Sequence, residues 1–176
     1  MDDAVFIVPY DPAWNARYAS EREAIVRALG DLMVGIEHFG STAIYGMPSK
    51  PVIDILVLVE HINPAETYIV HLKPLGYNQE VWPGQPEEHL FFRKGSPRTH
   101  HLHIVRQGGP EHLRHLAFRD YLRAHPEACR RYAELKEDLA VKYCYERELY
   151  TSGKTSFIRS IEAQAMPAKV EPGQGE

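Results

Sequence analysis

The apolar residues of this chain follow two spacings, which predict the order of its strands and helices. Segments rich in apolar residues at positions 34–39 and 52–59 are typical of short buried strands. Two further runs, residues 90–93 and 100–105, are separated by Lys94-Gly95-Ser96-Pro97. Because glycine, serine and proline favour turns, this second pair predicts a β-hairpin.

Helical spacing accounts for most of the remaining chain. The first helix is predicted to begin with Asp11 as N-cap and Pro12 at its first position, and to end at Gly30. A short helix or ordered loop is expected between the first two strands, at residues 42–49. Further helices are predicted at residues 64–75, 112–124, 126–145 and 155–165. The pattern therefore predicts an α+β fold with a mostly helical C-terminal part.

The length and composition suit a single domain. The chain has 176 residues, of which 44% are hydrophobic, enough to bury one core. We expect the domain to span residues 1–166 and residues 167–176 to form a disordered tail, since proline and glycine are frequent there. A net charge of −4 excludes a protein that binds nucleic acid regardless of sequence, which needs a basic excess.

Features that indicate cellular location are few. No apolar run reaches the length of a membrane span, and the first residues lack the basic start of a signal peptide. We therefore expect a cytoplasmic protein without membrane partners. Cys129 and Cys144 lie in helical patterns and are interpreted as reduced packing residues. The oligomeric state stays open, because no interface pattern stands out.

Candidate chemistry begins where the first two strands end. After the first strand, Gly40-Ser41-Thr42 can bring backbone N–H groups and hydroxyls close to an anion such as phosphate. The alternative is an ordinary turn in which serine or threonine caps a helix. The second strand carries Asp54 inside an apolar run. Because a buried carboxylate without a partner costs several kcal/mol, Asp54 should meet a metal, a cation or hydrogen-bond donors.

These two segments resemble a known family signature. The residues His38-Phe39-Gly40-Ser41-Thr42-Ala43, then Gly46 and Lys50-Pro51-Val52-Ile53-Asp54-Ile55, are similar to the GrpB family, members of the nucleotidyltransferase superfamily with the DNA polymerase β type of fold. The likeness continues through Leu75-Gly76-Tyr77, Phe92-Arg93-Lys94, residues 98–105, residues 118–122, Tyr150, Lys154 and Phe157-Ile158. It implies a mixed sheet flanked by helices.

The resemblance also implies a reaction. In such enzymes the Gly-Ser turn holds the phosphates of a nucleoside triphosphate, and strand carboxylates hold divalent metal, Mg²⁺ or Mn²⁺ ahead of Zn²⁺. The superfamily pattern places a second acid two residues after the first, on the same face of the strand. Here that position is Leu56, whose side chain cannot bind a metal ion. Transfer by the usual pair of metal ions is therefore in question.

Histidines could complete the set of metal ligands. His101 and His103 share one face of the strand that should lie beside Asp54, so Asp54, His101 and His103 are the candidate metal ligands. We prefer Asp54 with His103 as the catalytic pair, with the histidine as ligand or general base. The alternative is that one histidine simply hydrogen-bonds a buried acid.

Basic residues could contact the phosphates. Gly40, Ser41, Thr42, Lys50, Arg98 and Lys154 are the candidate phosphate-binding residues. For each basic residue the alternative is a solvated surface charge, and the family resemblance favours the site most for Lys50. Arg119-Asp120 could form a local ion pair or part of the site wall.

Three functions stay open. The first is a metal-dependent nucleotidyltransferase that binds a nucleoside triphosphate, with an unknown acceptor. The second is a binding module for a nucleotide or another phosphorylated small molecule, which kept the Gly-Ser turn and lost the second acid at Leu56. The third is a transition-metal enzyme that uses Asp54 with His101 and His103.

Overall fold

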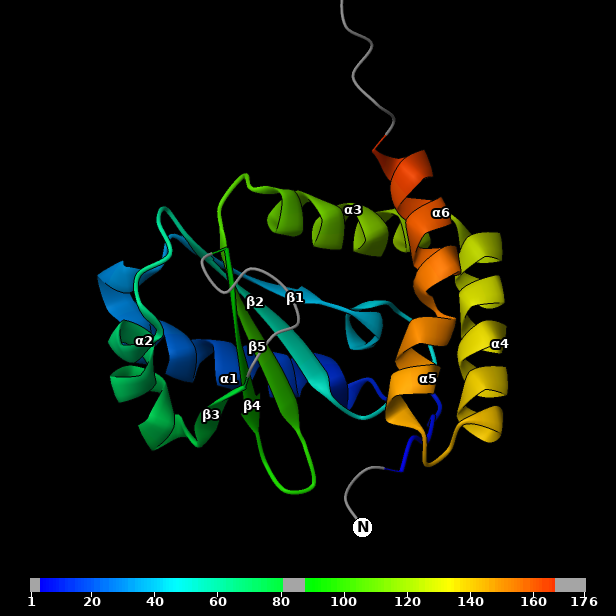
Figure 1. Ribbon diagram of the computed structural model, residues 1–176, viewed down its shortest axis with the longest axis horizontal. Helices are drawn as coiled ribbons and strands as arrows, with labels where there is room; N and C mark the ends of the chain where they lie inside the picture. The colour runs from blue at the N-terminus through cyan, green and yellow to red at the C-terminus, as the bar shows by residue number, and fades with distance from the viewer. Residues whose placement is uncertain (1–3, 81–87, 167–176) are drawn as a thin grey trace, which may run out of the picture.

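Five strands form one mixed sheet in a computed structural model that describes residues 4–80 and 88–166 (Figure 1). The strand order is β1-β2-β5-β4-β3. The bounds are β1 Gly35–Phe39, β2 Ile53–Val59, β3 Tyr77–Glu80, β4 His89–Lys94 and β5 His100–Arg106. The central strands β2 and β5 run parallel, and each other neighbouring pair is antiparallel. The sheet is therefore mixed, as predicted.

Side chains along β2 alternate between the face that packs in the main core and the face that carries Asp54. Ile55 and Val57 belong to the main core, which includes Trp14 of α1 (Ala13–Leu29) and residues of α2 (Ala65–Leu72). Asp54 and Leu56 lie on the opposite face, where Leu56 is fully buried among apolar side chains. The prediction that Asp54 and Leu56 share a face is confirmed.

The four C-terminal helices cover this second face and one end of the sheet (Figure 1). Their bounds are α3 Pro110–Ala124, α4 Pro126–Lys142, α5 Arg147–Gly153 and α6 Thr155–Ala165. Leu116 of α3 packs on the sheet beside Leu56. Leu122, Tyr132 and Ile161 form a separate small core among α3, α4 and α6. The helices thus cover the face of the sheet that carries Asp54.

The segment before α1 contacts both the residues that follow α4 and the loop before β2. The backbone N–H of Val5 donates to the carbonyl of Cys144, 2.6 Å away, just after α4. Val8 forms an isolated antiparallel bridge with Ser49, the residue before Lys50. Residues 5–8, called here the N-terminal strap, therefore join the C-terminal helices to the loop that leads into β2.

Most predicted elements are confirmed, with small shifts at their ends. Helix α1 begins at Ala13 with Pro12 as its N-cap, one residue later than predicted, and the N–H of Ala13 donates to Asp11 Oδ1 at 2.9 Å. The segment at residues 42–49 contains only a 3₁₀ turn, Ser41–Ala43, followed by a loop. Strand β3 and helix α5 were not predicted.

Other expectations can be compared directly with the structure. Both cysteines are free. Among the described residues, no helix has the length and apolar character that crossing a membrane requires. The expected tail at residues 167–176 lies outside the described part of the chain.

Candidate functional site

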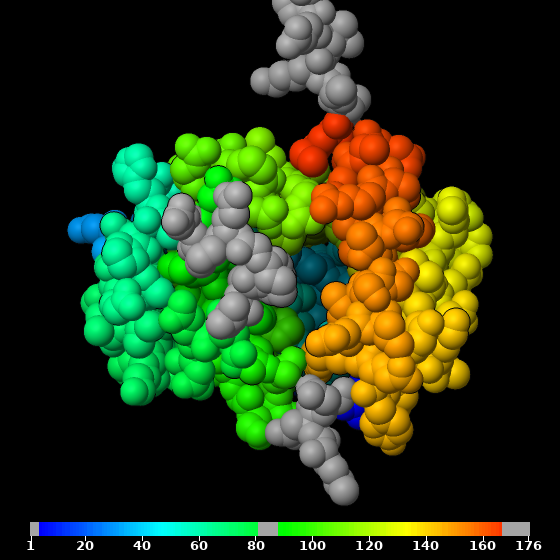
Figure 2. Space-filling view, viewed as in Figure 1, coloured from blue at the N-terminus to red at the C-terminus, as the bar shows by residue number. Residues whose placement is uncertain are grey.

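A cavity of about 400 Å³ opens between the sheet and the C-terminal helices. In the space-filling view it appears as a hollow between the green strands and the orange α5 and α6, with blue-green atoms on its floor (Figure 2). All the predicted site residues except Thr42 line this central cavity, namely Gly40, Ser41, Lys50, Asp54, Arg98, His101, His103 and Lys154. Residues far apart in sequence, predicted separately, thus meet in one place.

The turn after β1 lies directly against Asp54. Gly40 has φ +70° and ψ −172°, a conformation that side chains with a Cβ rarely adopt. A Cβ added there would lie 2.3 Å from Asp54 Oδ2. Phe39 and Asp54 are partners in the β1–β2 register, so the chain turns away from the sheet directly beside Asp54. Glycine is therefore required here by its contact with Asp54, before any ligand is considered.

Asp54 is hydrogen-bonded to His101. The Nδ1 of His101 lies 3.0 Å from Asp54 Oδ1, and the two residues are partners in the β2–β5 register. Burial raises the pKa of Asp54, but the hydrogen bond and charge of His101, together with Lys50, lower it below its ordinary value. Because the ionised carboxylate can only accept, His101 Nδ1 carries the proton. The buried acid has therefore found a hydrogen-bond donor, one of the partners expected for it.

His103 has a different partner from the one predicted. A hydrogen bond of 2.7 Å joins its Nδ1 to Nε2 of His89, the first residue of β4. The β2–β5 register places His103 opposite Leu56 and leaves His101 opposite Asp54. Period-two reasoning gave the correct face but the wrong neighbour, and the preferred pair of Asp54 with His103 is replaced by Asp54 with His101.

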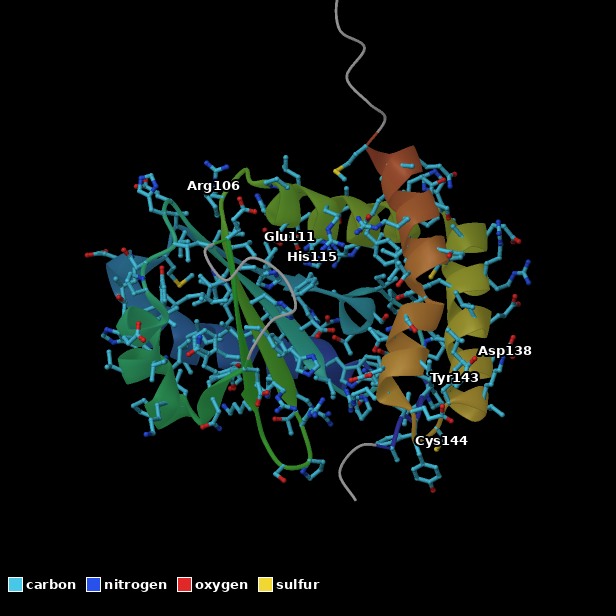
Figure 3. All side chains as sticks on the ribbon, in the orientation of Figure 1. Arg106, Glu111, His115, Asp138, Tyr143 and Cys144 are labelled. Carbon is cyan, nitrogen blue, oxygen red and sulfur yellow. The ribbon has the colours of Figure 1, made fainter. Side chains whose placement is uncertain are left out.

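Two residues of α3 extend the histidine cluster. Figure 3 shows Glu111 and His115 on the side of α3 that faces the sheet. The carboxylate of Glu111 lies 3.5 Å from His89 Nδ1 and 3.4 Å from His115 Nε2. Burial lowers the pKa values of His103 and His115, so both rings are neutral near pH 7. His103 and His115 therefore add no positive charge to the cavity under those conditions.

Thr42 lies behind the turn and not in the cavity. It is buried, and a hydrogen bond of 3.0 Å joins its Oγ1 to His38 Nε2. Its predicted phosphate contact is therefore corrected to a structural role that holds the turn. Arg119 supports the same strand from α3, donating to the His38 carbonyl at 2.8 Å and to Glu37 Oε2 at 2.9 Å. The Arg119-Asp120 pair thus fastens α3 to β1 and does not line the cavity.

Three lysines face the cavity from separate segments. Lys50 and Lys154 place their Nζ atoms 5.3 and 4.4 Å from the ring centroid of Tyr150 in α5. Lys136 of α4 is 2% exposed and donates to the Pro48 carbonyl. These residues, with Tyr150, form what we call the lysine cluster.

The lysine cluster is poorly hydrated, which changes its acidity. Burial, followed by the charge of Arg147, lowers the pKa of Lys50 to about 8. Burial also lowers the pKa values of Lys136 and Lys154 to about 7, and each of these two has a neighbouring lysine as its next largest cause. The three ammonium groups therefore repel one another, and the Asp54 carboxylate offsets this only in part for Lys50 and Lys154.

Sequence reasoning missed two cationic residues of the cavity, Lys136 and Arg147. Lys136 did leave a signal, because it lies midway between Tyr132 and Ala140 on the buried side of α4, four residues from each. A lysine within a buried helical stripe is unusual and deserves a functional interpretation. Arg147 belongs to α5, whose seven residues show no clear apolar period. Its place in the cavity follows only from the fold.

The cavity does not provide a set of metal ligands. Among the described residues that line it, Asp54 is the one carboxylate, and Asp54 already accepts from His101. Within residues 4–80 and 88–166, no three or more histidine, cysteine, aspartate or glutamate side chains are arranged to hold a metal ion. A hard cation such as Mg²⁺ prefers several oxygen ligands. The candidate metal ligands Asp54, His101 and His103 therefore do not fit a divalent metal in this arrangement.

A larger cavity lies on the other side of the loop between the turn and β2. It measures about 730 Å³ and is lined mainly by that loop, Tyr10, and residues of α3 and α4. None of the predicted site residues lines it. Its size alone gives it no chemistry, so the central cavity is the better candidate.

Comparison with known proteins gives three results. The family model described as "GrpB protein" matches residues 4–164. A UPF0157 protein of Pseudomonas aeruginosa is 41% identical over 177 residues, covering 97% of this chain and 72% of the relative. The crystal structure of the conserved protein GrpB from Enterococcus faecalis superposes with a TM-score of 0.84 and 35% identity, covering 91% of this chain and 96% of that one.

A more distant structural match involves the poly(U) polymerase Cid1 in its MgATP-bound form. It is 12% identical, with a TM-score of 0.47, and covers 74% of this chain and 45% of the polymerase. At that score the likeness carries no weight for activity. The predicted α+β fold, with its mixed sheet, flanking helices and helical C-terminal part, is confirmed by the observed topology and the Enterococcus structure.

Proposed function

The chain belongs to the GrpB family, and from its geometry we propose that the central cavity binds the phosphate groups of a nucleoside triphosphate. The observation that carries this proposal is the convergence of five basic side chains on one cavity, where the described lining residues include one carboxylate. They are Lys50, Arg98, Lys136, Arg147 and Lys154. Positive charges crowded into a partly buried cavity are costly unless an anion neutralises them, and phosphate is an anion that lysine and arginine bind well.

The turn supports the same proposal. Gly40 has no side chain, and Ser41 lines the cavity beside it, so a phosphate can approach the backbone there. The volume of about 400 Å³ falls within the usual range of small-molecule sites. Other phosphorylated small molecules share this chemistry, so the ligand panel must include them.

A thermal-shift experiment tests the proposal. The four common nucleoside triphosphates should raise the melting temperature of the protein, while the corresponding nucleosides should not. A ligand at one hundred times its dissociation constant stabilises the folded state by about 2.7 kcal/mol, which is readily detected. The Lys154→Gln variant should show a clearly smaller response. Lys142→Gln should keep it, because Lys142 is exposed and lies over Tyr143 outside the cavity. Equal shifts with triphosphates and nucleosides would remove the basis of the proposal.

Nucleotidyl transfer is the second candidate function, and the Asp54–His101 contact favours it. This pair lies beside the Gly40 turn, where a carboxylate and an imidazole could accept a proton from an attacking hydroxyl. Release of pyrophosphate from a nucleoside triphosphate, measured over a panel of acceptors, tests this step. Asp54→Asn should abolish the release while the protein stays folded. Release that persists in that variant would assign it to a contaminant.

The third function, a transition-metal enzyme, is not carried forward. It requires Asp54, His101 and His103 to share one ion. The observed hydrogen bonds instead assign His101 to Asp54 and His103 to His89.

A further inference from the structure

We infer that the lysine cluster binds the phosphate chain directly and does the work that a divalent metal would otherwise do. This inference rests on the proposed function, since it describes how the same cavity holds its ligand. It concerns Lys50, Lys136 and Lys154, which approach the cavity from the loop before β2, from α4 and from the start of α6.

The arrangement of charges is the first support. Metal-dependent phosphate sites place several carboxylates near the phosphates, so that the metal ion balances a negative site against a negative ligand. Among the described lining residues the lysines outnumber the single carboxylate, Asp54, which already accepts from His101. A triphosphate is itself strongly negative, so the lysines alone can neutralise it. A divalent cation would add positive charge to a site that already has it in excess.

The position of Leu56 is the second support. A second metal-binding acid would have to stand two residues after Asp54, on the same face of β2. Leu56 has no exposed surface and packs with Phe39 and Leu58 beneath α3, outside the lining of the cavity. A carboxylate at this position would be buried in an apolar cluster and would not face the phosphates. Substitution of one residue would therefore not rebuild a metal site.

The geometry around Tyr150 is the third support. Its ring lies beneath both Lys50 and Lys154, which holds the two ammonium groups near each other. Among the described residues, no carboxylate lies within ion-pair distance of any of the three lysines. Such an array is unfavourable when empty and becomes favourable when a chain of phosphates bridges it. The aromatic ring thus sets the spacing of a polyanion site.

Calorimetric titration of the full chain with inorganic triphosphate tests this inference. In EDTA the triphosphate should bind, with a dissociation constant no weaker than the one measured in Mg²⁺ or Mn²⁺. Binding that requires either metal would overturn the inference while leaving the proposed function intact. Failure to bind triphosphate and nucleoside triphosphates under every condition would overturn both.

Substitutions sharpen the same experiment. Lys50→Gln and Lys154→Gln should each weaken binding about tenfold or more, as expected for the loss of a charge-assisted hydrogen bond. Lys142→Gln is the matched control, because its ammonium lies over Tyr143 at 5.0 Å but is exposed and outside the cavity.

Asp54→Asn separates the two binding modes. If a metal carried the phosphates, loss of this carboxylate would abolish binding. With direct lysine contacts, binding should be unchanged or tighter, because a negative charge has left the site. Circular dichroism of each variant verifies that it is folded. A tenfold or greater loss of affinity in folded Asp54→Asn would overturn the inference.

Discussion

Replacing Gly40 by alanine should destabilise the protein strongly, because two costs meet at this residue. Its φ of +70° is unfavourable for any residue with a Cβ, at about 1–2 kcal/mol. The added Cβ would also lie 2.3 Å from Asp54 Oδ2 and 2.9 Å from its Cγ, and overpacking of this kind costs about 1–3 kcal/mol more. Urea unfolding followed by circular dichroism should therefore show a loss of roughly 2–5 kcal/mol.

Gly46 provides a matched control for this experiment. Its φ is +75°, and a Cβ there would meet no atom within 4 Å. Gly46→Ala should therefore show only the backbone cost, of about 1–2 kcal/mol. The difference between the two variants measures the contact of the turn with Asp54.

A double substitution isolates that contact. Asp54→Ala removes the two nearest atoms and leaves a Cβ contact of 3.0 Å, so in this background Gly40→Ala should cost little more than Gly46→Ala. Equal losses for Gly40→Ala and Gly46→Ala in the unchanged protein would refute the claim that Asp54 makes glycine necessary at the turn.

Three further predictions concern charge. Burial lowers the pKa of His38 to about 4, so between pH 6.5 and 4 the unfolded chain binds a proton that the folded chain does not. Urea titrations should therefore show the free energy of unfolding decreasing by about 3 kcal/mol from this group as the pH is lowered from 6.5 to 4. His38→Asn should flatten that slope, and an unchanged slope would contradict the assignment. For Lys154 the pKa falls to about 7, so the unfolded chain binds more protons from pH 7 to 10.5 and stability should rise with pH. Lys154→Gln should be more stable than the unchanged chain at pH 7, and lower stability would argue against a buried, repelled ammonium. Arg119→Met should cost about 2–4 kcal/mol because it leaves the His38 carbonyl and Glu37 without their donor, whereas loss of the exposed Arg130 should leave urea unfolding nearly unchanged.

The sequence predicted the faces of the sheet better than the contacts across it. Alternation along β2 correctly placed Asp54 and Leu56 on one face, because the side-chain period of a strand is fixed by its backbone. Which histidine meets Asp54 depends on the register between β2 and β5. The long connection between these two strands leaves that register to tertiary packing. The choice of His103 over His101 therefore could not be tested from spacing alone.

The cavity was predicted more completely from its sheet side than from its helical side, where Lys154 was predicted but Lys136 and Arg147 were not. Gly40, Lys50 and Asp54 stand in short apolar strands and their turns, where sequence signals are strong. Helix α5 has seven residues and little periodicity, so Arg147 could not be placed. Strand β3 was not predicted for a related reason. Only one of its four residues is fully buried, so its sequence shows little apolar alternation.

The N-terminal strap has a consequence for the order in which this protein folds during synthesis. Its bond from Val5 to Cys144 joins residues separated by most of the chain, and closing so long a loop is entropically costly and slow. The sheet can pair once β5 has left the ribosome, but α5 and Lys154 are made later. A nascent chain therefore carries the turn, Lys50 and Asp54 before Lys136, Tyr150 and Lys154 have been made. The ligand cavity should be among the last parts of the molecule to form, and its ligand could engage only the finished chain.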